Sequence, residues 1–226
     1  MTPPRRRVRW RPTWRLVASR FPPVALFDRV ADPADLEAVL AVEGLTDARR
    51  RDEAGELSLV ALADRISGPG TTPIMAAFTH LNPAGSRFTN GEYGVYYAGH
   101  TLETAIAETS YHRARFLAAT AQPPIEIDMR SYAADVDARL HDLRGLREAL
   151  PAVYDPLEYG AGQRLGAELR ASGSNGVVYE SVRDPGGECL GVFRPRVLSP
   201  ARQGPHYCYV WDGRAIIEVY RKESVR

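Results

Sequence analysis

Arg87, a tyrosine-rich segment with Tyr97 and the helical Glu108 lie within one short stretch of the chain, between Ser86 and His112. The guanidinium of Arg87 offers the two-pronged hydrogen bonding that suits a diphosphate. An aromatic ring such as that of Tyr97 can border or stack on a planar base. The carboxylate of Glu108 could stabilise positive charge on a sugar while its glycosidic bond breaks. These groups favour an enzyme that holds a dinucleotide and cleaves a glycosidic bond beside a cationic leaving group.

Each of these residues also has a structural interpretation. Glu108 could be a surface carboxylate that pairs with His112, four residues later on the same helix face. Arg87 could belong to a structural turn. Ser181 ends the apolar run Val177–Glu180, at a point where active-site groups often lie, but it could equally be an ordinary turn serine. The residues alone leave both interpretations open.

Several familiar catalytic motifs are absent from the chain. No G-x-S-x-G elbow surrounds Ser181, and neither a G-x-G-x-x-G loop nor a G-K-S/T loop occurs. A serine hydrolase, a Rossmann site and a P-loop therefore all lack support. Cys189 and Cys208, the only cysteines, form no C-x-x-C pair and have no histidine at metal-ligand spacing. We expect no metal site and two buried free thiols.

The candidate residues must be positioned by a strand and the helix that follows it. Alternation predicts a strand from Glu92 to Ala98, in which the two adjacent tyrosines point to opposite faces, one into the core and one toward a cleft. Thr101 caps the predicted helix, which runs from Leu102 to about Ala119 and carries Glu108 on the flank of its apolar stripe. The residues expected in that stripe are Leu102, Ile106, Thr109, Phe116 and Leu117.

The sequence pattern of the rest of the C-terminal half predicts several strands and one helical stretch. That stretch opens at Asp155-Pro156, is weakened by glycines as far as Gln163 and stops at Gly173. The Asp212-Gly213 pair predicts a type I′ turn in a hairpin. Strands are expected at Ile125–Met129, Val136–Leu140, Gly176–Glu180, Gly191–Arg194 and on both sides of the turn within Tyr207–Tyr220. The fold class is α+β, with a mostly antiparallel sheet core flanked by helices.

The N-terminal part is expected to contain one short strand and a helical block. The strand is an extended segment from Thr13 to Ser19, and the helical block covers residues 32–85. The first helix of the block has an N-cap at Asp32 and a C′ glycine at Gly44, and a weak helix runs from Pro73 to His80. We divide the chain into a tail (1–12), a first strand with the helical block (13–85) and a core (86–226). The last two form one compact domain.

Residues 1–12 are rich in arginine and have two interpretations. They could be a disordered basic tail, or an arm that docks on DNA or on an acidic partner. The chain as a whole has no such bias, because 29 Lys and Arg residues stand against 28 Asp and Glu residues. No apolar segment typical of a secretion signal or a membrane helix occurs, so we expect a cytoplasmic protein without membrane contact.

The segment Ser86–His112 resembles the RES domain family. It reads S-R-F…G-V-Y-Y-A-G…E-T-A-I-A-E…H, and the usual sequence pattern of the family is GRW…VYLA…A..E..H. The segment Asp155–Arg183 is similar to the second half of that family, a helix leading into a strand that ends in serine. The resemblance covers about residues 86–200 and rests on spacing as much as on identity.

The resemblance implies an ADP-ribosyltransferase-like fold that consumes NAD+. Phe88 departs from the family pattern by replacing the usual tryptophan, and Gly160 stands where some members have a serine. The helical block is also longer than in compact members. Matched position by position, the implied site residues are Arg87, Tyr97, Glu108 and Ser181, with Arg15 or its competitor Arg29 as the arginine of the first strand.

The same resemblance implies a toxin of a type II toxin–antitoxin pair, which binds NAD+ and breaks the nicotinamide–ribose bond. The long helical block is similar to the subgroup that ADP-ribosylates phosphoribosyl pyrophosphate synthetase, whereas compact members degrade NAD+ by hydrolysis or phosphorolysis. The implied partner is a helix-turn-helix, Xre-like antitoxin that occludes the active site and through which nucleic acid is bound. A non-catalytic binding module and a nucleic-acid-binding protein that uses the arginine arm remain alternatives.

Overall fold

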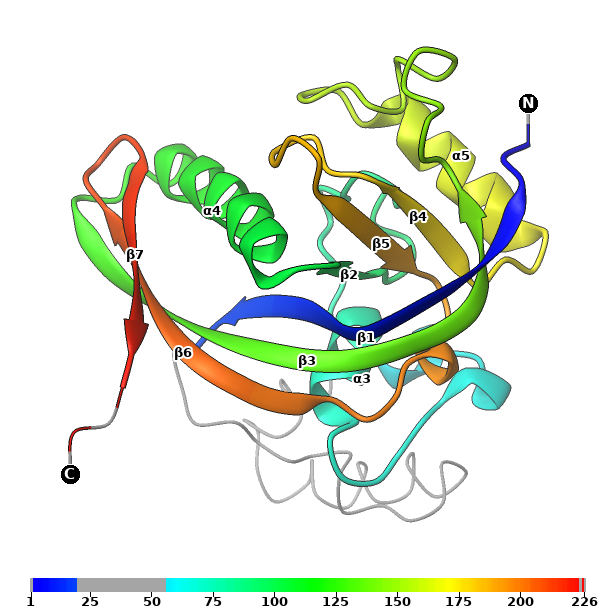
Figure 1. Ribbon diagram of the computed structural model, residues 1–226, viewed down its shortest axis with the longest axis horizontal. Helices are drawn as coiled ribbons and strands as arrows, with labels where there is room; N and C mark the ends of the chain where they lie inside the picture. The colour runs from blue at the N-terminus through cyan, green and yellow to red at the C-terminus, as the bar shows by residue number, and fades with distance from the viewer. Residues whose placement is uncertain (1, 20–55, 224, 226) are drawn as a thin grey trace.

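Seven strands and three α-helices make up the described part of the chain (Figure 1). The computed structural model describes residues 2–19, 56–223 and 225. The strands are β1 (Arg5–Ala18), β2 (Tyr96–Gly99), β3 (Ile125–Asp142), β4 (Gly176–Glu180), β5 (Glu188–Val192), β6 (Arg202–Trp211) and β7 (Ile216–Lys222). The helices are α3 (Thr72–Thr79), α4 (Leu102–Ala119) and α5 (Gly160–Ala171), with 3-10 turns at Leu57–Leu59, Leu62–Asp64 and Pro195–Val197. The predicted α+β class is confirmed, and among the described strand pairs only β3–β4 is parallel.

Five of the strands close into a ring. The sheet order is β1-β2-β5-β4-β3-β6-β7, and an additional pairing of β1 with β3 joins the two ends of the first five strands. β3 pairs with β1 along one edge, while its other edge pairs with β6 and then with β4. Because side chains alternate across a strand, every second residue of the ring points inward. The inward residues include Trp10, Tyr96, Val136, Val178 and Leu190, and side chains of α3 join the same cluster.

Helix α4 lies outside this ring and contacts β1 and β2 (Figure 1). Its start is fixed by Thr101, whose hydroxyl accepts the N–H of Thr104 at 3.2 Å, as the sequence predicted. Leu102 and Ile106 pack on a small apolar cluster beneath the helix. Phe116 is 57% exposed, so its predicted place in the core stripe is wrong. Its ring lines a cavity, where no core side chains cover it.

The prediction of a disordered tail is wrong. Residues 5–18 form β1, which pairs with β3 over most of its length. Val8 points into the ring, whereas Arg7 and Arg9 point outward and both pair with Asp137 of β3, at 2.6 and 3.4 Å. Arginines alternate with apolar residues in R-V-R-W-R, and this period of two is typical of a half-buried strand. The high arginine content of the segment obscured that pattern. The extended segment expected from residue 13 is thus only the second half of β1.

Three further expectations about strands need correction. The two strands expected at 125–129 and 136–140 are one strand, β3, because β1 pairs with it across the intervening residues. Strand β5 begins at Glu188, earlier than expected, while β4 has the predicted bounds. The β6–β7 hairpin is confirmed, but its connection contains residues 212–215 and is no type I′ turn. The Asp212 carboxylate accepts two backbone N–H groups of this loop and so favours the longer connection.

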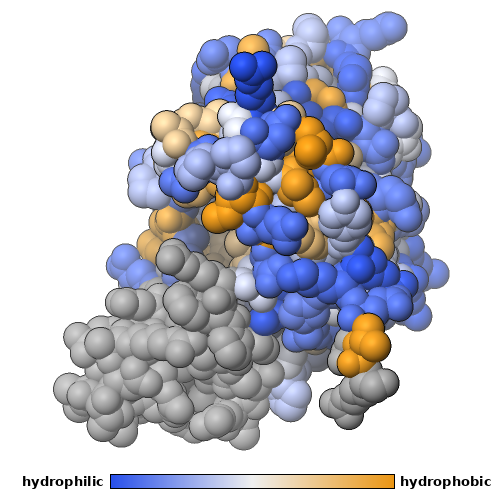
Figure 2. Space-filling model, turned by 90° about the vertical axis from the view of Figure 1, so that its left-hand side faces the viewer, coloured by the Kyte–Doolittle hydropathy of each residue, from blue (hydrophilic) through white to orange (hydrophobic). Residues whose placement is uncertain are grey.

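Part of the predicted helical block lies outside the described residues, as do Arg29 and the helix expected between Asp32 and Gly44. Within residues 56–85 the structure has two 3-10 turns and α3, which begins one residue before the predicted Pro73. None of the helices in the described part of the chain combines the length and the apolar character that a membrane span requires. Figure 2 shows the face that bears α4 and the β6–β7 hairpin, where separate apolar patches lie within a mostly hydrophilic surface.

Two glycines let α5 pack directly on the backbone of the turn that carries Arg87. The helix begins at Gly160, so the glycines expected to weaken it lie inside it. A Cβ on Gly162 would overlap the carbonyl oxygen of Arg87, and a Cβ on Gly166 would overlap that of Phe88. Helix and turn are therefore in backbone contact, and the helix fixes where the turn lies.

We predict that Gly166→Ala destabilises the fold by about 1–3 kcal/mol, because the added methyl group overpacks a backbone contact. The matched control is Gly160→Ala in the same helix, where the nearest atom to a new Cβ is the tip of the Arg164 side chain, 3.7 Å away. That variant should stay within about 1 kcal/mol of the parent, since alanine favours a helix. Urea denaturation compares the two, and equal stabilities would contradict the packing role of Gly166.

Candidate functional site

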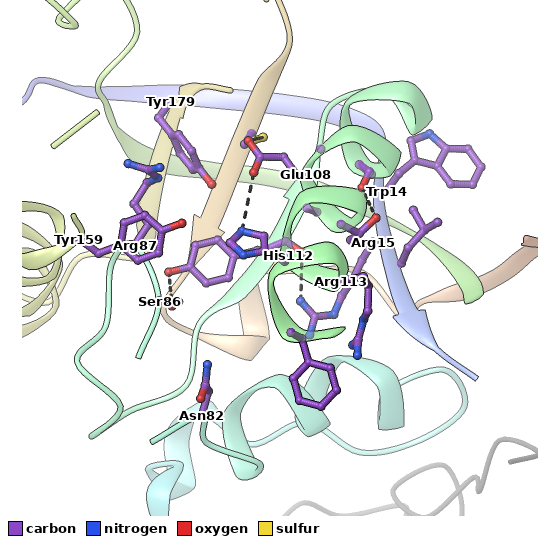
Figure 3. Close-up of a pocket in the computed structure, with 18 of the residues that line it drawn as sticks. Trp14, Arg15, Asn82, Ser86, Arg87, Glu108, His112, Arg113, Tyr159 and Tyr179 are labelled. Carbon is purple, nitrogen blue, oxygen red and sulfur yellow. Dashed lines mark hydrogen bonds and ion pairs between the residues drawn. The ribbon is translucent and has the colours of Figure 1, made fainter. Parts of the chain in front are cut away.

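One cavity of about 380 Å³ brings the sequence-predicted residues together between α4, β1, β2 and the turn before β2 (Figure 3). This volume falls within the range of ~300–1,000 Å³ that is usual for small-molecule sites. Arg15, Arg87, Tyr97 and Glu108 all line it, and Ser181 lies directly behind Glu108. The other lining residues are Trp14, Leu16, Asn82, Gly85, Ser86, Ala98, Gly99, Ala105, Thr109, His112, Arg113, Phe116, Tyr159, Tyr179 and Cys189.

Glu108 is a half-buried carboxylate whose side chain is 21% exposed. Its Oε1 accepts the Ser181 hydroxyl at 2.7 Å, and the thiol of Cys189 is 3.9 Å away. The predicted contact with His112 exists, with 3.9 Å between His112 Nε2 and Glu108 Oε2. It occurs at the cavity, where both residues line the wall, so Glu108 is not a plain surface acid.

Ser181 lies in a turn and also contacts Glu108 at the cavity wall. It follows β4, is 2% exposed, and its Oγ accepts the backbone N–H groups of Arg183 and Asp184 at 3.0 and 2.9 Å. These bonds use the oxygen lone pairs, so the hydroxyl hydrogen points to Glu108 Oε1. The turn therefore directs the neutral Ser181 hydroxyl at the Glu108 carboxylate, and this hydrogen bond fixes the orientation of the carboxylate.

Tyr97 joins the walls of the cavity. Its hydroxyl oxygen accepts the N–H of Phe88 at 2.9 Å and is 2.8 Å from the Ser86 hydroxyl, so it holds the turn that carries Arg87. Burial raises the pKa of Tyr97 well above its usual value, and the phenol stays neutral. The neighbouring Tyr96 is fully buried inside the ring, which confirms that the two tyrosines face opposite ways.

Arg87 is held in place and still faces the cavity. Its Nη1 donates to the carbonyl oxygens of Val153 and Asp155 at 2.8 and 3.0 Å, and its guanidinium lies 4.8 Å from the centre of the Tyr159 ring. Within the described part of the chain, Nε and Nη2 make no hydrogen bond. Arg87 thus has the structural role and also leaves two nitrogen atoms for a ligand.

Arg15 lies across the cavity from Arg87, beside Arg113 (Figure 3). Its Nη1 donates to the Tyr97 carbonyl at 3.1 Å, while its buried Nε has no hydrogen-bond partner among the described residues. Burial lowers the pKa of Arg15 and of Arg113. In the described residues, no carboxylate lies within ion-pair distance of Arg15, Arg87 or Arg113. Their positive charge is therefore available to an anion.

Sequence reasoning missed four members of the site. Arg113 follows Glu108 by five residues and lines the same wall from α4, which the helical wheel could have revealed. Tyr159 and Tyr179 come from segments far along the chain, and nothing in their local sequence marks them. Cys189, which the sequence indicated only as a buried thiol, is also a lining residue. Among the described residues, no cluster of three or more metal-ligating side chains occurs.

The arrangement suits an anionic ligand with planar rings. Three guanidinium groups without a carboxylate partner among the described residues can neutralise phosphates, and tyrosine rings can border a base. One carboxylate, held by a neutral hydroxyl, lies between the arginines and can stabilise positive charge that develops on the ligand.

Comparisons with known proteins place these residues in a family context. The family model described as the RES domain matches residues 62–212, a range that contains Arg87, Tyr97, Glu108 and Ser181. The uncharacterized protein y4oC of Sinorhizobium fredii (strain NBRC 101917 / NGR234) is 32% identical over 209 residues, which cover 92% of this chain and 86% of that protein. Among solved structures, the M. tuberculosis MbcT–MbcA toxin–antitoxin complex matches with a TM-score of 0.47 and 12% identity, covering 92% of this chain and 87% of that chain.

The Glu108–His112 contact predicts a coupled titration. Burial lowers the pKa of His112, the nearby arginines lower it further, and Glu108 opposes both effects. Glu108→Gln removes the carboxylate charge, so the His112 pKa should fall further below its usual value of 6.5. NMR titration of the histidine ring signals measures this shift, with His141 at the far end of β3 as an internal control. An unchanged or raised His112 pKa would show that the carboxylate is not near the imidazole.

Proposed function

The chain belongs to the RES domain family, and from that premise we propose that it is the toxin of a type II toxin–antitoxin pair with an ADP-ribosyltransferase-like fold. In this proposal it binds NAD+ in the cavity and breaks the nicotinamide–ribose bond. The single observation that supports it best is the Ser181–Glu108 hydrogen bond of 2.7 Å in a cavity that Arg15, Arg87 and Arg113 also line.

Glu108 would act on the ribose. When the bond from C1′ to the nicotinamide nitrogen breaks, its electron pair stays on that nitrogen and nicotinamide leaves as a neutral molecule. Positive charge then develops on the ribose carbon and ring oxygen. A carboxylate fixed before the reaction stabilises that charge without reorganising, and the Ser181 bond supplies this fixation.

Arg15 and Arg87 would bind the phosphates of NAD+, and Tyr97 would border the nicotinamide with its ring. The Tyr97 hydroxyl is engaged by the Phe88 N–H and its pKa is raised, so the proposal gives it no part in proton transfer. Arg29 lies outside the described residues. Only Arg15 can therefore be argued from contacts as the arginine of the first strand.

The acceptor of ADP-ribose distinguishes two forms of this proposal. We favour transfer to a protein, with phosphoribosyl pyrophosphate synthetase as the target that the family subgroup suggests. Water or phosphate as acceptor would make the enzyme an NAD+ glycohydrolase or phosphorylase. Both forms place the reaction in the cytoplasm, where NAD+ is abundant. Mass analysis of the reaction products separates them.

We predict that the purified chain releases nicotinamide from NAD+ and that Glu108→Gln lowers the rate by ~10²–10³, as is typical for loss of one electrostatic contact in the transition state. The fold should stay intact, because glutamine keeps the volume of the side chain. The control is Glu103→Gln in the first turn of α4, an exposed acid outside the cavity, which should retain the parent rate. Release of nicotinamide by Glu108→Gln at the parent rate would remove Glu108 from the mechanism. A folded parent chain that leaves NAD+ intact, with or without a protein acceptor, would refute the proposed function.

The proposed partner is a helix-turn-helix, Xre-like antitoxin that occludes the cavity. A cationic concave site attracts acidic side chains and is the most direct place to block an enzyme in its own cytoplasm. We expect ADP-ribose to weaken antitoxin binding, and the antitoxin to weaken ADP-ribose binding by the same factor. Titration of each ligand in the presence of the other measures the coupling. Independent binding of the two would mean that inhibition acts at a distance.

A further inference from the structure

Helix α4 presents a continuous face to the cavity over most of its length. The cavity residues on this helix follow one another at intervals of three and one positions, as expected for one side of an α-helix. They are Ala105, Glu108, Thr109, His112, Arg113 and Phe116. The face therefore continues two turns beyond the proposed catalytic carboxylate and ends with Arg113 and Phe116.

Arg113 and Arg15 form a pair of like charges at this end of the cavity. Figure 3 shows them side by side, with Arg87 on the opposite side and Glu108 and His112 between. Their mutual repulsion contributes to the lowered pKa of Arg15, after the larger effect of burial. Two half-buried guanidinium groups without a carboxylate partner in the described chain are unfavourable in the empty site. A ligand that brings two negative charges removes this cost.

Phe116 lies one helical turn beyond Arg113. The residue is 57% exposed although it lines the cavity, and the Arg113 guanidinium lies 6.0 Å from the ring centre. An exposed aromatic ring beside a cation offers a stacking surface for a base, because the base covers apolar area that water now contacts. Trp14 of β1 lines the same cavity and supplies a second ring.

The order of these residues along α4 matches the order of groups along NAD+. With a rise of about 1.5 Å per residue, Arg113 lies roughly 7.5 Å and Phe116 roughly 12 Å beyond Glu108 along the helix axis. In the dinucleotide, the nicotinamide ribose is followed by the diphosphate and then by adenosine. We propose that the C-terminal half of α4 is the adenosine-diphosphate subsite, in which Arg113 and Arg15 bind the diphosphate and Phe116 stacks on adenine. This inference rests on the proposed function. Arg87, across the cavity, would contact the same diphosphate from the nicotinamide side.

Binding to a slow variant tests the subsite directly. In a Glu108→Gln background, in which turnover is expected to be ~10²–10³ slower, calorimetry measures the affinity for NAD+, ADP and nicotinamide mononucleotide. Phe116→Ala should weaken NAD+ and ADP by roughly 5-fold or more, since stacking of one base contributes about 1–3 kcal/mol. The affinity for nicotinamide mononucleotide, which lacks adenine, should change less than about 2-fold. Arg113→Met should weaken NAD+ and ADP by about 10-fold or more, as expected for charged hydrogen bonds.

Two control variants are available on the same molecule. Arg115→Met removes an exposed arginine of α4 that does not line the cavity, and Ile217→Ala removes an exposed apolar side chain of β7. Neither should change any of the three affinities. If NAD+ binds but Phe116→Ala and Arg113→Met leave its affinity and that of ADP unchanged, the subsite is wrong and the proposed function stands. If the background variant binds neither NAD+ nor the mononucleotide and the parent chain leaves NAD+ intact, both fail.

Discussion

The pairing of β1 with β3 is the constraint on which the rest of the site depends. It closes the five-strand ring, so that inward side chains of all five strands share one core. The same pairing carries β1 past the end of β2, with Trp14 opposite Gly99 on one side and Ala133 on the other. Arg15, the next residue, pairs with Tyr132 of β3, and this pairing holds it at the cavity wall. A tail without this pairing could not place a buried guanidinium there, because the entropy of the free segment would oppose it.

The opposite wall of the cavity depends on close approach between backbones. Gly162 and Gly166 let α5 touch the backbone of Arg87 and Phe88, and the Tyr97 hydroxyl accepts the Phe88 N–H from the other side. The turn is thus held between a helix and a strand that are distant in sequence. Its position decides where the Arg87 guanidinium lies, since Nη1 is bound to two carbonyl oxygens beyond residue 150. Positioning and ligand binding are combined in one side chain, so substitutions of Arg87 would perturb both.

The sequence predicted the local elements of the site better than the distant contacts. The cap at Thr101, the bounds of α4 and β4 and the opposite faces of Tyr96 and Tyr97 follow from periodicity and capping chemistry, which act over a few residues. The first half of β1, up to residue 12, is predicted as a tail because its stability comes from a partner strand more than 110 residues away. The hydrogen bond from Ser181 to Glu108 could not be read from the chain for the same reason. The helical wheel puts Arg113 and Phe116 near one side of α4, but only the structure shows that this side lines the cavity.

The electrostatic state of Glu108 follows from what surrounds it. An arginine at ion-pair distance would neutralise the carboxylate and lower its value for stabilising a cation in a ligand. The structure has instead neutral partners around it: the Ser181 hydroxyl donates to Oε1, and the Cys189 thiol has a pKa raised by burial. The pKa of His112 is lowered, so its imidazole brings less positive charge to Glu108 than an unperturbed histidine would. The arginines stand on either side, available for phosphates (Figure 3). This separation of one negative charge from three positive charges within a single cavity costs stability in the empty protein. It matches a ligand that carries negative phosphates and, as its bond breaks, a positive sugar.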